Sequence, residues 1–169
     1  MAPKGSAFLY ARRQHHAWMN PLIVSWGYEA EATFSTGSRF IDYFEWLGTR
    51  DLAPFLATPA AIEFQSEFAW DAVRDRCHQL TCEIRRRVND LTGLEPICPE
   101  TSKWFGQMSA IRLPELDTEV LQDQLRKNYR IEVPVLRWQG IPLIRVSVQG
   151  YNDQRDVDAL IAALKDLLV

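Results

Sequence analysis

Residues 131–148 read IEVPVLRWQGIPLIRVSV, and this stretch decides the fold of the C-terminal half of the chain. It holds two runs rich in β-branched and other apolar residues, Ile131–Trp138 and Pro142–Val148. Between them lies Gln139-Gly140, and a short connection that contains glycine is typical of a β-hairpin. We therefore expect two antiparallel strands joined by a tight turn.

The segments on either side of this hairpin complete a small α+β module. Upstream, Gly106–Leu113 is expected to form a strand, and Asp117–Asn128 a short helix capped by Asp117 or Thr118. Downstream, Asp153 begins a helix with one apolar face. That face consists of Val157, Leu160, Ile161, Leu164, Leu167 and Leu168. The order of elements predicts a three-stranded antiparallel sheet with helices on one face.

Two further helices are expected before the module. Ala53–Phe64 carries helix-forming residues, and Pro59 should kink or split that helix because proline lacks the amide N–H. Between residues 67 and 91 apolar side chains recur at spacings of three and four, and Gly93 is a typical stop signal. This stripe consists of Trp70, Val73, Cys77, Leu80, Ile84, Val88 and Leu91. We expect Arg85-Arg86-Arg87, near the end of the helix, to form a solvated face.

The first third of the chain lacks the elements needed to build a core of its own. Ser6–Ala11 and Pro21–Ser25 are strand-like runs, a helical turn is expected within Arg12–Met19, and Glu29–Ser38 has the composition of an exposed loop. Two isolated strands cannot bury both of their faces without further strands. This region is therefore expected to belong to a larger domain.

Composition excludes several classes of protein. The 169 residues hold 19 Lys and Arg against 22 Asp and Glu, a net charge of −3, which argues against nucleic acid or an anionic membrane as the main partner. No run approaches the roughly 18 apolar residues of a membrane span, and the start lacks an export signal. The odd number of cysteines, at Cys77, Cys82 and Cys98, follows no metal-ligand spacing. We expect reduced thiols, no metal and a cytoplasmic protein.

The sequence carries no motif for self-contained catalysis. It has no Gly-x-Ser-x-Gly elbow, no glycine-rich phosphate loop, and no His and carboxylate paired at helical spacing. We interpret His15, His16 and His78 as surface or packing residues. Lys4, beside a glycine near the start of the chain, is interpreted as a solvated lysine.

Two positions are better candidates for a binding site. Arg145 interrupts a strongly apolar strand, so its guanidinium needs an anion, which is either an internal carboxylate or a carboxylate ligand held by its planar fork. Gly48-Thr49-Arg50 is a small turn with a hydroxyl group just before a helix start, which is suited either to a phosphate or to a plain helix cap.

Four segments, taken in order, resemble a known family. They are APKGSAFLYAR (2–12), PLIVSWG (21–27), FEWLGTRDLAPFLATPAAIEF (44–64) and IPLIRVSVQGYNDQRDVDALIAAL (141–164). In these segments the chain is similar to the C-terminal part of class V aminotransferases, fold-type I enzymes that use pyridoxal 5′-phosphate (PLP). The branch it most resembles is that of the isopenicillin N epimerase-like proteins, and cysteine desulfurases are more distant relatives.

The resemblance implies a role for three residues. Arg145 occupies the position of the arginine that binds the α-carboxylate of the amino-acid or keto-acid substrate. Gly48 and Thr49 match the Gly-Thr that contacts the PLP phosphate of the neighbouring subunit in a homodimer. The resemblance also divides the chain into a remnant of the large PLP-binding α/β domain (1–50, with remnant strands), connecting helices (51–92) and a small C-terminal α+β domain (93–169).

The family's Schiff-base lysine precedes the Ala-Pro-Lys-Gly segment and finds no counterpart here, since Lys4 matches the residue after the proline. We therefore expect a fragment that has no catalytic residue, holds no PLP stably and is inactive alone. The intact enzyme would act at the α-carbon of an amino acid by epimerisation, transamination or elimination. The alternative is a non-catalytic pseudo-enzyme or interaction module that pairs with a full-length relative.

Overall fold

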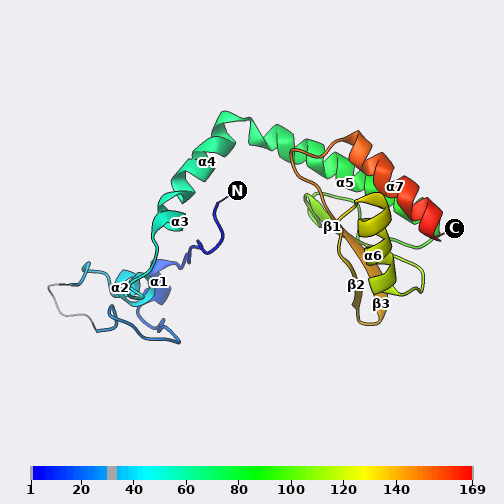
Figure 1. Ribbon diagram of the computed structural model, residues 1–169. Helices are drawn as coiled ribbons and strands as arrows, with labels where there is room; N and C mark the ends of the chain where they lie inside the picture. Colours follow the sequence, from blue (N-terminus) through cyan, green and yellow to red (C-terminus); the bar gives the residue numbers. More distant parts are fainter. Residues whose placement is uncertain (1, 30–33, 169) are drawn as a thin grey trace. The chain divides into compact units, whose positions relative to one another are not determined.

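The computed structural model describes residues 2–29 and 34–168 of the chain. It divides into two compact units, Met1–Glu67 and Phe68–Val169 (Figure 1). Part of the loop expected at Glu29–Ser38 lies outside the described residues. The three-part division at residues 50 and 92 concerns the intact protein and stays a prediction.

The second unit is built on a three-stranded sheet. Its strands are β1 (Met108–Arg112), β2 (Val135–Trp138) and β3 (Ile141–Ser147), which lie in the order β1-β3-β2 with both pairs antiparallel. The hairpin between β2 and β3 turns at Gln139 and Gly140, whose φ angles of 49° and 81° are both positive. Positive φ at both turn residues matches the twist of a two-residue hairpin. The hairpin and the three strands are confirmed, but the strand predicted at Ile131–Trp138 begins only at Val135.

Three helices cover one face of this sheet: α5 (Trp70–Thr92), α6 (Thr118–Tyr129) and α7 (Gln154–Leu168) (Figure 1). The Asp117 carboxylate caps α6 by accepting from the backbone N–H groups of Glu119 and Val120 at 3.0 and 3.1 Å. The α5 helix ends at Gly93, as expected, with φ of 68° and its N–H bonded to the Asn89 carbonyl at 2.7 Å. The predicted α+β class, with helices on one face, is confirmed.

The core lies between the sheet and the helices. Its buried members from the strands include Ile111, Val135, Ile144 and Val146. From the helices it takes Cys77, Ile84, Val88, Leu121, Leu125, Val157, Leu160, Ala163 and Leu164. Ile144 and Val146 are 0% and 2% exposed, whereas the alternate residues Arg145 and Ser147 are exposed. The period of two along β3 thus directs Arg145 away from the core.

One expectation for α5 is wrong. Arg85 does not belong to a solvated face, since it is only 1% exposed. Its Nη2 donates to the Cys98 carbonyl at 2.7 Å, and its Cζ lies 4.1 Å from the centre of the Phe105 ring. Arg85 directly follows Ile84 on the buried side of the helix, and the loop after the helix supplies the partners that a buried guanidinium needs. Arg86 is exposed, as expected.

The first unit contains short helices: α1 (Arg13–His16), α2 (Arg39–Glu45), α3 (Ala53–Leu56) and α4 (Thr58–Glu67). The predicted turn within residues 12–19 is confirmed by α1. The predicted split is confirmed as well, because Pro59 stands in the first turn of α4, directly after α3 has ended.

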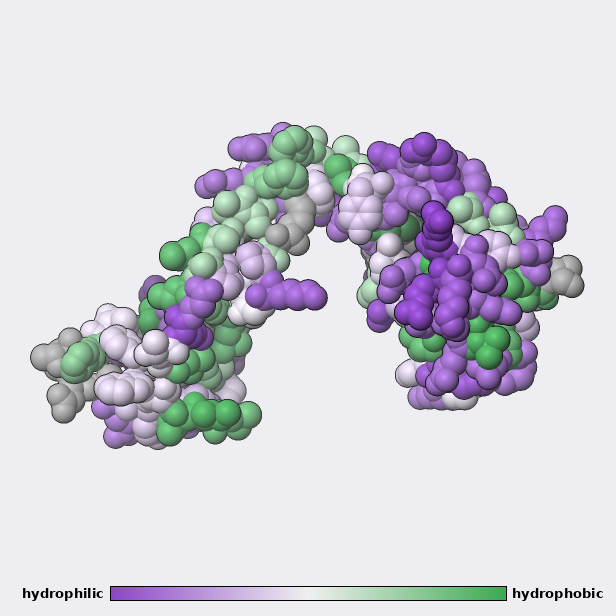
Figure 2. All heavy atoms as spheres, in the orientation of Figure 1, coloured by the Kyte–Doolittle hydropathy of each residue, from purple (hydrophilic) through white to green (hydrophobic). Residues whose placement is uncertain are grey.

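The strands expected at Ser6–Ala11 and Pro21–Ser25 do not form, so that part of the prediction is wrong. Neither segment pairs with another strand among the residues described in this unit. Their apolar side chains face solvent: Phe8 is 91% exposed and Leu22 is 103% exposed. A strand without a neighbour leaves its backbone groups unpaired, which removes the reason for a ladder. Figure 2 shows apolar surface gathered on this unit.

No helix in the described parts of the chain is long and apolar enough to cross a bilayer.

Candidate functional site

Arg145 lies in the middle of β3 with its side chain exposed on the face of the sheet that the helices leave uncovered. Its backbone N–H donates to the Pro134 carbonyl at 2.9 Å, and it pairs in register with Ala110 of β1. The guanidinium makes no hydrogen bond or ion pair with any residue in the described ranges. The internal carboxylate that the sequence left open as its partner is therefore not found within residues 2–29 and 34–168.

A second arginine of the sheet shows the contrasting arrangement. Arg137 of β2 forms an ion pair with Glu115, and it also donates to the carbonyl groups of Leu116 and Gly140 at 2.7 and 2.9 Å. Its hydrogen bond holds the pKa of the Glu115 carboxyl below its ordinary value. Arg137 shares a face with the buried Val135, towards the helices. Arg137, a structural arginine of this sheet, is thus paired with a carboxylate, whereas Arg145 has no carboxylate partner among the described residues.

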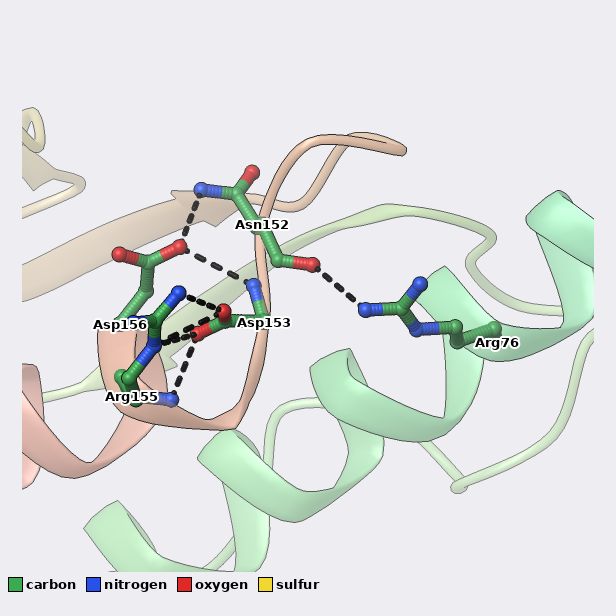
Figure 3. Close-up of polar contacts among 5 residues, drawn as sticks. All are labelled: Arg76, Asn152, Asp153, Arg155 and Asp156. Carbon is green, nitrogen blue, oxygen red and sulfur yellow. Dashed lines mark hydrogen bonds and ion pairs between the residues drawn. The ribbon is translucent and has the colours of Figure 1, made fainter.

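The turn after β3 fixes the strand end by hydrogen bonds centred on Asn152 (Figure 3). The Asn152 Oδ1 accepts from the Gln149 N–H at 2.9 Å, and its Nδ2 donates to Asp156 Oδ2 at 3.0 Å. From α5, Arg76 donates to the Asn152 carbonyl at 3.2 Å. Asn152 therefore links the turn after β3 to α7 and α5.

The ion pair of Asp153 with Arg155, also drawn in Figure 3, stands at the start of α7. Hydrogen bonds from the Arg155 side chain and backbone lower the pKa of the Asp153 carboxyl. An ionised carboxylate at a helix N-terminus favours the helix, because it complements the helix dipole. The turn is thereby held in place on both sides of Asn152.

The Gly48-Thr49 turn lies in the first unit, between α2 and α3. Gly48 has φ of 93°, a conformation that favours glycine. Thr49 is exposed, and its hydroxyl has no partner among the described residues. The start of α3 is served by Asp51, whose Oδ1 accepts from the Ala53 N–H at 2.9 Å. The helix-capping role is therefore filled by Asp51, which leaves the Thr49 hydroxyl available for a ligand.

A hollow of about 260 Å³ beside this turn is lined by residues that include Asp42, Glu45, Gly48 and Arg50. Asp42 is 5% exposed and accepts from Ser35 Oγ at 2.6 Å, as well as from the N–H and hydroxyl of Thr36. These hydrogen bonds lower the pKa of Asp42, so the carboxylate stays ionised. Two carboxylates oppose an anion inside the hollow. The residues therefore fit a phosphate only on the open side, at Gly48 and Thr49.

The histidines and cysteines do not form an activated nucleophile in the described structure. His78 Nδ1 donates to the Gly106 carbonyl at 3.0 Å, and its Nε2 lies 3.5 Å from Cys82 Sγ. Burial raises the pKa of the Cys82 thiol, which keeps it protonated and unreactive. His16 stacks on Phe40 with ring centres 4.0 Å apart, so it is a packing residue, as expected.

Sequence reasoning missed Arg112, the last residue of β1. Its Nε is buried and has no hydrogen-bond partner in the described chain. Alternation within Met108–Arg112 places Arg112 on the same face as Ala110, and Ala110 lies opposite Arg145. The register of β1 against β3 was the missing information, since the β1 sequence alone does not tell which strand it pairs with.

A search against family models finds no match. Among curated proteins, the chain is 39% identical to an isopenicillin N epimerase from Amycolatopsis lactamdurans and 34% identical to one from Streptomyces clavuligerus. It is also 24% identical to a probable cysteine desulfurase from Chlamydia trachomatis.

Each of these three alignments covers 99% of this chain and 44% of the relative. The chain thus spans less than half the length of the curated relatives it matches. These similarities are consistent with the resemblance to the C-terminal part of the class V aminotransferases that the sequence implied.

Proposed function

We propose that this chain supplies the substrate-carboxylate arginine and the mobile small domain of a PLP-dependent class V aminotransferase-like enzyme. That enzyme would act at the α-carbon of an amino acid. The observation that carries the proposal is Arg145, an exposed guanidinium on the open face of the sheet with no anion among the described residues. An arginine kept for internal structure would be paired, as Arg137 is with Glu115.

The environment of Arg145 suits a carboxylate ligand. A guanidinium presents parallel N–H donors whose spacing matches the two oxygens of a carboxylate. Strands β1, β2 and β3 contain no Asp or Glu, so no acid from the sheet itself competes for the site. Holding the α-carboxylate in this bidentate way would fix the orientation of the α-carbon and of the bonds around it.

We assign Gly48 and Thr49 to a contact with the phosphate of PLP in a neighbouring subunit of a homodimer. The free Thr49 hydroxyl and the φ of 93° at Gly48 support this contact, because they leave a donor group on an open turn. When bound, PLP supplies the electron sink that makes bonds at the α-carbon of an amino acid easier to break.

By itself the chain is proposed to be inactive and to hold no PLP stably. No residue of the matched segments stands in the place of the family's Schiff-base lysine. Lys4 is exposed in the described structure, and it has no charge partner there that would activate its amine. The purified chain mixed with PLP is expected to show no new absorbance band and no adduct after borohydride reduction.

A second candidate is a non-catalytic partner of a full-length relative. The exposed apolar side chains of the first unit support an interaction role, since Phe8, Leu22 and Trp26 are 91%, 103% and 79% exposed. Mixing the chain with a full-length relative and measuring complex formation by size-exclusion chromatography tests this candidate. A complex that forms without Arg145-dependent carboxylate binding would favour it over the first proposal.

The first proposal is tested by observing the arginine Nε–Hε signals of the chain by NMR while butyrate is added. We expect the Arg145 signal to shift saturably, at millimolar butyrate, and Arg145→Gln to abolish the response. Arg126→Gln, which removes an exposed arginine of α6 paired with Asp123, is the matched control and should leave the Arg145 shift unchanged. No movement of the Arg145 signal would contradict the proposal.

A further inference from the structure

The open face of the sheet carries a second unpaired cation beside Arg145. In the β1–β3 register, Ala110 lies opposite Arg145 and Arg112 lies opposite Leu143. Residues that face each other across an antiparallel pair share a face, and so do residues two apart on one strand. Arg112 and Arg145 are therefore diagonal neighbours on one face of adjacent strands. Such neighbours lie about 7–8 Å apart, within reach of long side chains.

Arg112 is held in an unfavourable state in the described structure. Its Nε is shielded from solvent and has no hydrogen-bond partner, and its side chain forms no ion pair there. A buried donor of a charged group without a partner destabilises a protein, and a second cation nearby adds repulsion. Structure alone therefore gives no reason for Arg112, whereas Arg137 on the other face is paired with Glu115.

The residues around the two arginines are apolar. Leu143, which lies opposite Arg112 and two residues before Arg145, is 5% exposed, and Met108 and Trp138 flank the face at 54% and 55% exposure. An apolar surround strengthens the attraction between a guanidinium and an anion, because it excludes the water that screens charge. The face is thus arranged for an anion with two charged ends.

We propose that Arg112 and Arg145 bind a substrate with two acid groups, Arg145 holding the α-carboxylate and Arg112 the second acid. This inference rests on the proposed function, because it takes Arg145 as the α-carboxylate residue. It adds the substrate class: an amino acid or keto acid whose side chain ends in a carboxylate or a similar anion. Arg112 then acts in specificity, since it contacts the substrate away from the α-carbon.

The test compares glutarate, which has two carboxylates, with butyrate, which has one on a chain of similar length. Isothermal titration calorimetry is run on the wild-type chain and on Arg112→Met, Arg145→Gln and Arg137→Gln. Arg112→Met keeps an apolar stem and removes the unpaired Nε, so we expect its melting temperature to be held or raised. Arg137→Gln is the matched control from the opposite face of the same sheet.

We expect the wild type to bind glutarate at least about tenfold more tightly than butyrate, because the second contact forms within an already bound molecule. Arg112→Met should remove this preference and keep butyrate binding, and Arg137→Gln should keep both. The Arg112 Nε–Hε signal of the unmodified chain should move with glutarate and not with butyrate, which provides a readout that needs no variant.

Three results separate the two proposals. Equal affinity for both acids in the wild type, or a preference that survives Arg112→Met, overturns the inference on Arg112. If butyrate binding still depends on Arg145 in that case, the proposed function stands. Butyrate binding that is unchanged in Arg145→Gln overturns the proposed function itself.

Discussion

The two units of the chain differ in how they bury their apolar side chains. In the second unit, a sheet and three helices enclose residues such as Val88, Leu125 and Ile144, each 0% exposed. In the described part of the first unit, Tyr43 is the only apolar residue that is buried, while Leu22 and Trp26 face solvent. The second unit therefore has a core of its own, and the first depends on further contacts to bury its apolar side chains.

Core substitutions should separate the two units most strongly. Leu164, 0% exposed in α7, contacts the core between sheet and helices, so Leu164→Ala should lower the free energy of unfolding of the second unit by about 2–5 kcal/mol. Leu22→Ala, in the first unit, should change it by less than about 0.5 kcal/mol, since that side chain is already solvated. Urea unfolding monitored by far-UV circular dichroism measures both. Equal effects of the two substitutions would contradict the comparison.

Arg85 provides a second, smaller test of the core. Its buried guanidinium donates to the Cys98 carbonyl and lies over Phe105, so Arg85→Gln should cost about 1.5–3 kcal/mol in unfolding free energy. Arg86→Gln is the matched control, because within the described residues Arg86 makes only an exposed 3.5 Å pair with Glu100. That control should stay within about 0.5 kcal/mol of the wild type. If Arg86→Gln proves the more damaging substitution, the assignment of Arg85 to the core is wrong.

How far the sequence predicts this fold follows from the range of the interactions involved. The hairpin and the α5 stripe depend on local period and turn chemistry, and they were predicted. Burial of Arg85 depends on a loop that returns to the helix, which no local pattern reveals. The position of Arg112 beside Arg145 depends on the register of β1 against β3, which no local pattern reveals either.

The N-terminal strands illustrate a different limit. Ser6–Ala11 and Pro21–Ser25 have strand-like composition, yet a strand forms only where a neighbour accepts its hydrogen bonds. Within the described residues neither segment has such a neighbour. Composition therefore reports what a segment is suited to, and the partner decides whether the strand forms.

The exposed apolar residues of the first unit should bind a dye that reports apolar surface, or drive self-association. Replacing Leu22 and Trp26 together by serine should clearly reduce the fluorescence of bound anilinonaphthalene sulfonate, because both side chains are solvated. Val120→Ser, at a half-exposed position of α6 in the second unit, is the control and should leave the signal unchanged. A compact monomer without dye binding would contradict the comparison for the first unit.

The smallest expected effect is a pH response in the first unit. Hydrogen bonds from Ser35 and Thr36 lower the pKa of Asp42, so this carboxylate favours the folded loop above the ordinary carboxyl pKa of about 3.9. That contribution is lost as pH falls through the lower folded value. The protection factor of the Thr36 amide, which corrects for the intrinsic pH dependence of exchange, should therefore fall at acidic pH, and Asp42→Asn should remove this fall. A Thr36 protection factor that does not change with pH would show that these hydrogen bonds do not hold the loop.

The central claim is that Arg145 binds the carboxylate of a ligand and forms no ion pair within the chain. A crystal structure of the chain grown with butyrate tests it most directly. The account predicts two parallel N–H···O contacts of about 2.7–2.9 Å between the Arg145 guanidinium and the butyrate carboxylate. An Arg145 side chain ion-paired with an Asp or Glu of the same chain would contradict it.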